Sequence, residues 1–207
     1  MKYIIANWKM SFDSTEIKTW LKYFKPDSKN EIILAPSYPF FTEIKDYPLA
    51  AQNISEYPEG PYTGSVAANQ LKEYCKYCIV GHSEIGDNLE QKLKKATLCM
   101  ENGLIPIICF VDTTELGQLS QKGVILAWED PSSISKGAPF KKLDLGEIQN
   151  TVVKIKEQTK NIPLLYGGSV NRQNSLSLVK MGVDGVLVGQ ASLDPLHFLD
   201  IVHAFEV

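Results

Sequence analysis

Tyr166-Gly167-Gly168-Ser169-Val170 follows a short apolar run at residues 162–165 and is predicted to open a helix. Val186-Leu187-Val188-Gly189 repeats this order of strand, glycine and helix. Backbone N–H groups are free at the start of a helix, and the helix dipole favours an anion there. The two stretches therefore predict a pair of phosphate-binding loops, which often follow the last two strands of an eight-stranded β/α barrel.

Short apolar runs recur at fairly even intervals along the chain. Unbroken apolar runs, rather than alternating ones, are typical of parallel strands that are buried on both faces. The runs lie at residues 3–6, 32–35, 49–51, 78–80, 104–110, 124–128, 162–166 and 183–188. Eight such strands, with the phosphate loops after the last two, predict a (β/α)8 barrel.

Amphipathic stretches lie between most of these runs. The clearest are residues 14–24, 89–100, 145–158 and 195–205. Asp13 and Ser14 precede the first of them, and Pro195 follows Asp194 at the start of the last, which are signals of a helix N-terminus. This regular alternation, without a linker or a low-complexity segment, predicts a single barrel domain over residues 1–207.

The connection between the fifth and sixth strands is short. About a dozen residues lie between Asp112 and Gly123, and Gly117 interrupts them, so we expect a turn or two of helix at most. The rival fold is a doubly wound open sheet, which usually carries its glycine-rich loop after the first strand. Here the first strand ends in Asn7-Trp8-Lys9, which favours the barrel.

The composition is that of an ordinary globular protein. The 207 residues are 44% hydrophobic and 22% charged, with a net charge of −3. No basic stripe is present, which argues against a nucleic-acid partner. No apolar run approaches the ~20 residues of a membrane span, and the N-terminus is too quickly polar for a signal peptide. We therefore expect a cytoplasmic protein without a membrane partner.

The four cysteines do not form a recognisable site. Cys75 and Cys78 have C-x-x-C spacing, but Cys99 and Cys109 do not supply the second close pair that a zinc site needs. A redox pair would need thiols at a helix N-terminus, whereas Cys75 and Cys78 flank the entry to an apolar strand. The expectation is reduced structural thiols and no metal site.

Active sites of such barrels lie at the C-terminal ends of the strands. The polar and thiol residues at these ends are Asn7, Lys9, Gln52, Asn53, His82, Ser83, Glu84, Cys109 and Glu129. Glu129 follows an apolar run, so partial desolvation would raise its basicity and suit it to act as a general base. Lys9 would neutralise an oxyanion, and His82 would hydrogen-bond to substrate oxygens. Each alone has a structural alternative, but together they favour proton transfer next to a carbonyl.

Several stretches, in order along the chain, resemble the triosephosphate isomerase family. They are Asn7-Trp8-Lys9-Met10, Ala51-Gln52-Asn53, Tyr62-Thr63-Gly64, Gly81-His82-Ser83-Glu84, Trp128-Glu129, Tyr166-Gly167-Gly168-Ser169-Val170, Gly182-Val183-Asp184-Gly185 and Ala191-Ser192-Leu193. The resemblance covers essentially the whole chain. It implies a TIM barrel that interconverts dihydroxyacetone phosphate and D-glyceraldehyde 3-phosphate through an enediolate, in glycolysis and gluconeogenesis, without a metal or an organic cofactor.

The resemblance also implies a role for each site residue. Glu129 would carry the proton between C1 and C2, and Lys9 with Asn7 would stabilise the enediolate. His82 would be the neutral electrophile for which this family is itself the standard example. The residues implied in substrate binding are Ser135, Gly167, Gly168, Ser169, Gly189 and Gln190, and those implied in support are Ser83, Glu84 and Cys109.

Three features depart from the family pattern. The family usually has a Pro-x-Trp hinge after the base, where a lid begins, but this chain has Asp130-Pro131-Ser132-Ser133-Ile134-Ser135-Lys136-Gly137. Gln190 replaces a second glycine in the last phosphate loop. The chain is also some tens of residues shorter than is usual for this fold, and we expect the loss mainly between strands five and six.

The segment from Glu56 to Gly64 resembles the third loop of the family, which protrudes into a neighbouring subunit. Pro58 and Pro61 favour an ordered loop. The resemblance implies a homodimer in which Thr63 reaches the site of the other subunit. The structural alternative is an ordinary surface loop.

Two other functions are compatible with parts of the pattern. Another phosphate-binding barrel, such as an enzyme of indole or thiamine synthesis, would share the glycine loops but would not require Gly-His-Ser-Glu beside Asn-x-Lys. A degenerate barrel that binds sugar phosphates without turnover would explain the changed hinge. The joint presence of Lys9, His82 and Glu129 favours the isomerase.

Overall fold

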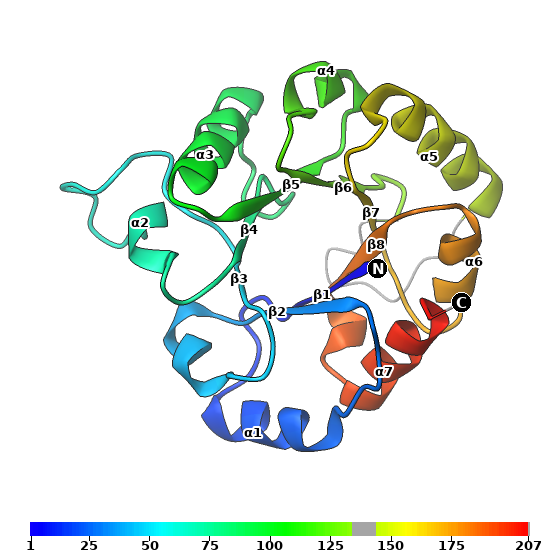
Figure 1. Cartoon of the computed structure of the whole chain (residues 1–207), viewed down its shortest axis with the longest axis horizontal. Helices are drawn as coiled ribbons and strands as arrows, with labels where there is room; N and C mark the ends of the chain where they lie inside the picture. The colour runs from blue at the N-terminus through cyan, green and yellow to red at the C-terminus, as the bar shows by residue number, and fades with distance from the viewer. Residues whose placement is uncertain (134–143, 207) are drawn as a thin grey trace.

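A computed structural model describes residues 1–133 and 144–206 and contains eight parallel strands in a nearly closed barrel (Figure 1). The strands are β1 (Tyr3–Asn7), β2 (Glu31–Ala35), β3 (Ala50–Ala51), β4 (Tyr77–Val80), β5 (Ile105–Phe110), β6 (Ile125–Glu129), β7 (Leu164–Gly167) and β8 (Gly185–Val188). Their order in the sheet is β2-β1-β8-β7-β6-β5-β4-β3. A single parallel bridge between Leu34 and Leu49 joins the two ends. The eight predicted strands and the (β/α)8 barrel are confirmed.

Helices surround the barrel on its outside (Figure 1). The α-helices of the described residues are α1 (Ser14–Tyr23), α2 (Ala68–Leu71), α3 (Leu89–Glu101), α4 (Leu116–Leu119), α5 (Leu145–Thr159), α6 (Ser175–Lys180) and α7 (Pro195–Ala204), and the 3-10 helices are η1 (Tyr38–Glu43), η2 (Thr113–Glu115) and η3 (Gln190–Ser192). Asp13 caps α1 by accepting hydrogen bonds from the N–H groups of Thr15 and Glu16. Asp194 caps α7, which has proline in its first turn. The four predicted amphipathic helices are therefore confirmed.

Alternate side chains of each strand enter two separate cores. Ile5 points into the barrel, whereas Ile4 and Ala6 pack between the strands and the helices. The residues inside the barrel are Ile5, Ile33, Ala35, Ala50, Tyr77, Ile79, Ile107, Cys109, Ile125, Ala127, Leu165 and Leu187. A barrel that is filled in this way is a rigid base, on which the strand ends hold their polar residues in place.

The connection between β5 and β6 is short, as predicted. It holds only η2 and the four-residue helix α4. Gly117 lies inside α4 rather than interrupting it, and Leu116 and Leu119 of this helix are fully buried. The helix therefore covers the barrel wall with two side chains.

One local prediction is wrong. The turn at Gly167-Gly168 does not open a helix directly, because α6 begins only at Ser175. The side chains of Asn171 and Asn174 cap each other's backbone N–H groups and form a separate turn before the helix. The glycine turn after β8 opens only the short 3-10 helix η3. Neither of the predicted phosphate loops presents the N-terminus of a long helix, so each offers only the N–H groups of its own turn.

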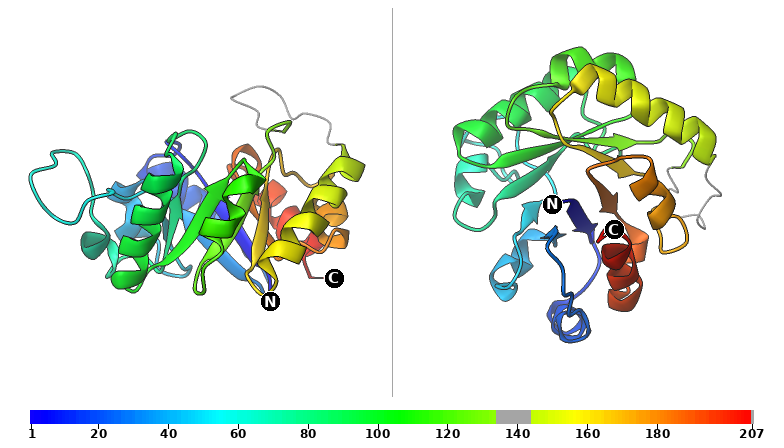
Figure 2. Two further views of the ribbon diagram at one scale, coloured as in Figure 1. Left: turned by 90° about the horizontal axis from the view of Figure 1, so that it is seen from above. Right: turned by 45° about the vertical axis from the view of Figure 1, so that its right-hand side comes forward.

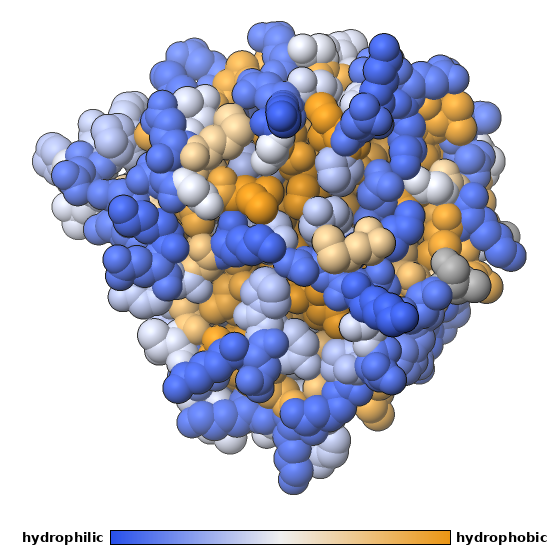
Figure 3. All heavy atoms as spheres, in the orientation of Figure 1, coloured by the Kyte–Doolittle hydropathy of each residue, from blue (hydrophilic) through white to orange (hydrophobic). Residues whose placement is uncertain are grey.

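The N-terminus and the loop after β3 lie near opposite edges of the barrel. Figure 2 shows the N-terminus at one edge of the barrel and the cyan loop that follows β3 projecting sideways near the other. On the face in Figure 3, hydrophilic side chains cover most of the rim and apolar side chains gather nearer the middle. Among the described residues, no helix is both long and apolar enough to cross a membrane.

Candidate active site

The C-terminal ends of β1, β4 and β6 bring together the three residues that the sequence singled out. Lys9 follows β1, His82 follows β4, and Glu129 is the last residue of β6. The Nε2 atom of His82 lies 3.6 Å from Oε1 of Glu129. The Nζ atom of Lys9 lies 2.5 Å from Oε1 of Glu84, two residues after His82. A carboxylate, an imidazole and an ammonium group thus share one end of the barrel.

Glu129 is buried, and Ser83 holds its carboxylate. The side chain is only 7% exposed. The N–H of Ser83 donates to Oε2 over 2.8 Å, and the hydroxyl of Ser83 donates to Oε1 over 2.7 Å. Two hydrogen bonds compensate the ionised carboxylate for the loss of water. The group is thereby held in one position beside the imidazole.

The hydrogen bonding of His82 determines which ring nitrogen carries its proton. The backbone N–H of Glu84 donates to Nδ1 of His82 over 3.2 Å. A nitrogen that accepts a hydrogen bond has no proton, so the neutral ring carries its proton on Nε2. Nε2 is the atom on the side of Glu129. The neutral imidazole is therefore oriented as a donor toward Glu129 and the site.

Lys9 has a backbone that ordinary residues avoid. Its φ angle is 53°, in the left-handed region. The side chain of Asn7 accepts a hydrogen bond from the N–H of Lys9 over 3.1 Å. The carbonyl of Lys9 accepts hydrogen bonds from the side chains of Gln52 over 2.8 Å and Ser37 over 3.1 Å. Since side chains of three neighbours fix this peptide, the direction in which the lysine side chain leaves the barrel is fixed as well.

The two glycine loops lie next to this group. Among the described residues, no group accepts a hydrogen bond from the backbone N–H of Gly168, Ser169 or Gly189. A Cβ atom on Gly189 would lie 3.4 Å from Cε of Lys9, so the β8 loop faces the lysine. Free N–H groups close to a lysine are suited to bind an oxyanion. Gln190 is exposed at the start of η3.

Two of the predicted site residues need separate comment. Ser135 lies outside the described residues, as does the rest of the lid sequence from Ile134 to Gly137. Cys109 is fully buried at the end of β5. Burial, and then the charge of Glu129, raise the pKa of its thiol well above the usual range. It therefore remains a neutral thiol near Glu129. All four cysteines are free and buried.

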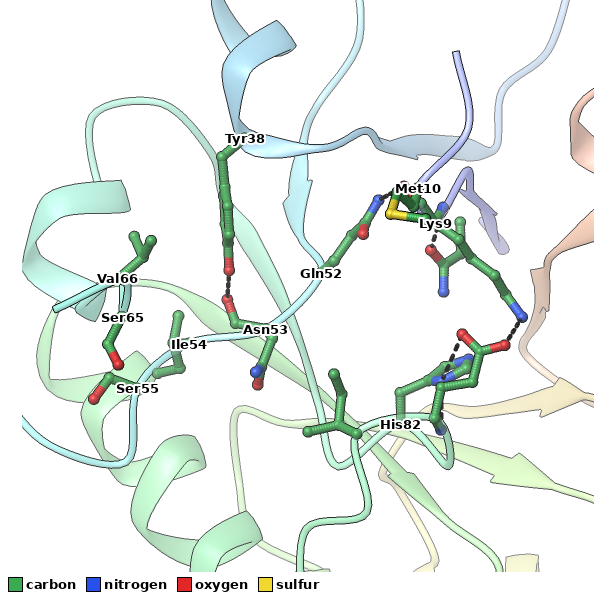
Figure 4. A pocket seen from close by; sticks show the side chains of 14 residues that line it. Lys9, Met10, Tyr38, Gln52, Asn53, Ile54, Ser55, Ser65, Val66 and His82 are labelled. Carbon is green, nitrogen blue, oxygen red and sulfur yellow. Dashed lines mark hydrogen bonds and ion pairs between the residues drawn. The ribbon is translucent and has the colours of Figure 1, made fainter. Parts of the chain in front are cut away.

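A cavity of about 440 Å³ lies beside the site. Figure 4 shows Lys9 and Met10 on one side of it and Asn53, Ser55, Ser65 and Val66 on the other, with His82 at its floor. Glu129 and the glycine loops are not part of its lining. The cavity is thus a second space that opens between the candidate site and the loop after β3.

The sequence profile of the triosephosphate isomerase family matches residues 2–205. The chain belongs to this family. Triosephosphate isomerase interconverts the two triose phosphates, and it is an isomerase that works in glycolysis. The family resemblance read from the sequence is confirmed by this match, and the barrel is the fold that gives the TIM barrel its name.

Individual triosephosphate isomerases show the same relationship along their whole length. Those of Dictyoglomus turgidum and Aquifex aeolicus are each 32% identical to this chain, and the alignments cover 98% and 99% of this chain and 99% of each relative. That of Mycoplasmopsis pulmonis is 31% identical, with 96% of both chains covered. The first alignment spans 249 positions, whereas this chain has 207 residues. This triosephosphate isomerase family member is therefore shorter than its relatives.

Some residues that shape the site were not assigned a role from the sequence. Gln52 was noted at a strand end, but its part in fixing the Lys9 carbonyl depends on how β1 and β3 approach each other. Asp130 and Tyr166 are hydrogen-bonded to each other across β6 and β7. The one signal for Asp130 in the sequence was its place directly after Glu129, where the family usually has proline.

Proposed function

We propose that this protein interconverts dihydroxyacetone phosphate and D-glyceraldehyde 3-phosphate, with Glu129 as the base, His82 as the electrophile and Lys9 as the stabilising cation. The observation that carries the proposal is the pair of Glu129 and His82, whose carboxylate and imidazole are 3.6 Å apart. Glu129 and His82 thus face the same side of the site, from which a carboxylate and an imidazole can reach neighbouring atoms of one small substrate once the Glu129 side chain moves away from Ser83. Membership of the triosephosphate isomerase family supports the substrate.

In the proposed reaction, each of the site residues has one task. Glu129 takes the proton from C1 of dihydroxyacetone phosphate, which leaves an enediolate, and returns it at C2 to give the aldehyde. The Nε2–H of His82 donates to the carbonyl oxygen and moves the hydroxyl proton between the two oxygens. Lys9 and Asn7 stabilise the negative charge that develops there. Glu129 leaves Ser83 to reach C1, so its present position is the resting position of the base.

The phosphate group is bound at the two glycine loops. The free N–H groups of Gly168, Ser169 and Gly189 provide the donors, and Lys9 adds a positive charge on the side of Gly189. Gln190 keeps a backbone N–H at the position where the family has a second glycine. Gly167 joins Glu129 to this turn: a Cβ atom on it would lie 3.6 Å from Cγ of the base, which is an ordinary contact.

The first test is catalysis itself and the identity of the base. In a coupled assay with glyceraldehyde 3-phosphate, we expect turnover by the unchanged protein and a loss of about 100-fold or more in kcat for Glu129→Asp. The shorter side chain pulls the carboxylate back by about one bond, and misplacement of about 1 Å costs a reaction of this kind about two orders of magnitude. Glu90→Asp, on the exposed surface of α3, is the matched control.

The outcomes separate the competing functions. A Glu129→Asp variant with the unchanged rate would overturn the assignment of the base. Absence of turnover by the unchanged protein, with inorganic phosphate still bound, would instead indicate a barrel that binds sugar phosphates without converting them.

We further propose a homodimer in which the loop from Glu56 to Gly64 enters the cavity beside the site of the other subunit. Tyr57 and Tyr62 stack within the loop at 4.6 Å, which gives it an ordered shape. The cavity has room for a loop tip, and Met10 on its lining is 96% exposed. The dimer is thus supported by a protruding loop and by a cavity that this chain does not fill itself.

Sedimentation and kinetics test the dimer together. We expect the unchanged protein to sediment as a dimer, and Thr63→Arg to give a monomer with reduced kcat, because a long cation does not fit between Asn7 and His82 of the cavity wall. Thr97→Arg, at an exposed position of α3, should leave both properties unchanged. A fully active monomer of the unchanged protein would contradict the proposal.

We also propose a cytoplasmic location, because the reaction belongs to glycolysis. Cell fractionation with an antibody to the protein tests it, and recovery in the membrane fraction would contradict it.

A further inference from the structure

A buried carboxylate lies directly beside the proposed base. Asp130 follows Glu129 in the chain and is only 4% exposed. Its two oxygens accept hydrogen bonds from the N–H and the hydroxyl of Ser132, over 2.9 and 2.8 Å, from the hydroxyl of Ser133, and from that of Tyr166 over 3.1 Å. We call Asp130, Ser132, Ser133 and Tyr166 the Asp130 cluster.

Within the described part of the chain, no positive charge balances the Asp130 cluster. Among residues 1–133 and 144–206, no Lys, Arg or His forms an ion pair with Asp130. A buried carboxylate is costly unless hydrogen bonds replace its water, and here four donors do so. Burial raises the pKa of the Tyr166 hydroxyl, so that hydroxyl keeps its proton and remains a donor.

The same residues attach the chain after β6 to the turn after β7. The N–H of Asp130 donates to the carbonyl of Gly167 over 3.1 Å. The hydroxyl of Ser169 donates to the carbonyl of Ser133 over 2.7 Å. Together with the bond between Tyr166 and Asp130, these contacts join the strand end that carries the base to the loop that carries the free N–H groups. Proline, which lacks the N–H and the carboxylate, could make neither contact of Asp130.

We propose that Asp130 is a positioning residue, which fixes Glu129 relative to the phosphate-binding turn after β7. The proposal rests on the proposed isomerase function. Asp130 touches no reacting atom; it acts by locking the peptide that follows Glu129, through its own N–H and through the hydroxyls around its carboxylate. The base must reach C1 of a substrate whose phosphate is held by the turn after β7. If the hydrogen bonds of Asp130 to this turn are lost, we therefore expect the rate of proton transfer to change more than the affinity for the substrate.

Three substitutions separate positioning from simple stability. We expect Asp130→Ala to lower kcat at least about tenfold while KM changes by less than about threefold, the pattern of an interaction that acts on the transition state. Asp130→Asn keeps the shape of the side chain and one acceptor oxygen. Its amide N–H can donate to hydroxyls of the cluster that rotate to accept, so we expect kcat within about threefold of that of the unchanged protein. Tyr166→Phe removes one donor and should lower kcat by an intermediate factor.

Asp194→Ala provides the matched control, since it removes the cap of α7 and lowers stability without touching the site. Thermal melts of every variant identify an assay temperature at which all of them are folded. If Asp130→Ala does not fold, the kcat of Tyr166→Phe alone tests the positioning role.

An unchanged kcat in Asp130→Ala or, failing that, in Tyr166→Phe would overturn the positioning role, as would a loss confined to KM. So would an equal loss of kcat in Asp194→Ala. If the unchanged protein itself does not turn over triose phosphates, the proposed function fails instead, and the two failures are thus distinguishable.

Discussion

At the scale of single residues, two of the four non-glycine residues with positive φ angles in the described part of the chain lie where the ligand is expected. Lys9 and Ser169 both have positive φ angles, 53° and 46°, and for residues other than glycine such a conformation costs about 1–3 kcal/mol. Asn7 and Gln52 fix the peptide of Lys9. The carbonyl of Ser169 accepts hydrogen bonds from the amides of Asn171 and Asn174. The neighbours thus maintain an unfavourable backbone that turns the ammonium group and the N–H donors toward one place.

The two glycines of the β7 turn should tolerate substitution differently. A Cβ atom on Gly168 would lie 3.0 Å from both Cβ of Ser133 and the hydroxyl oxygen of Tyr166, whereas one on Gly167 would have no neighbour closer than 3.6 Å. We therefore expect Gly168→Ala to weaken the binding of inorganic phosphate about tenfold, because the turn must shift, and Gly167→Ala to weaken it much less. Isothermal titration measures both. Equal affinities would show that the turn yields to the added methyl group.

At the scale of the elements, the sequence predicted what depends on local patterns. The apolar runs located all eight strands, and helical spacing with capping residues located α1, α3, α5 and α7. The start of α6 was wrong, because the turn of Asn171 and Asn174 is held by side-chain bonds that periodicity does not reveal. The Asp130 cluster was missed for a related reason: Ser132 and Ser133 are neighbours of Asp130 in the chain, but Tyr166 comes from β7 and meets Asp130 only in the folded barrel.

The connection between β5 and β6 offers a matched pair of glycines. Gly117 lies in α4, and a Cβ atom there would meet nothing within 4 Å. Gly123 has a φ angle of 94°, which alanine adopts only with strain. We expect Gly117→Ala to raise the free energy of unfolding by about 0.5–1 kcal/mol and Gly123→Ala to lower it by about 1 kcal/mol or more. Urea denaturation tests both, and a destabilised Gly117→Ala would mean that α4 is not helical in solution.

At the scale of the whole molecule, a short chain keeps the complete barrel. The helices α2 and α4 have four residues each and α6 has six, yet both cores remain buried. The short helices lie outside the barrel, whereas Lys9, His82 and Glu129 lie at the strand ends. We propose that residues 1–207 form one domain, which a single cooperative unfolding transition would support and two separated transitions would contradict.

Buried thiols should make this domain sensitive to alkali. Burial raises the pKa of Cys75 from 9.0 to about 11, and it also raises the pKa of Cys78 well above its usual range. Between these values the unfolded chain releases thiol protons that the folded chain retains. The stabilisation by these neutral thiols is therefore complete below pH 9 and is lost as the pH rises through about 11. Each thiol contributes a slope of up to about 1.4 kcal/mol per pH unit in this window.

Urea denaturation under reducing conditions, at intervals from pH 7 to pH 11, measures this slope. We expect the free energy of unfolding to fall more steeply above pH 9 in the unchanged protein than in Cys75→Ala, whose side chain has no proton to release. Other titrating groups, such as Tyr77 with a pKa raised to about 12, are common to both proteins and cancel in the difference. Cys75 lies in the outer core, where its thiol contacts the carbonyl of Leu71, and it is not part of the proposed site, so the variant should keep its activity at pH 7. Parallel curves for the two proteins would show that the Cys75 thiol ionises as readily in the barrel as in the unfolded chain.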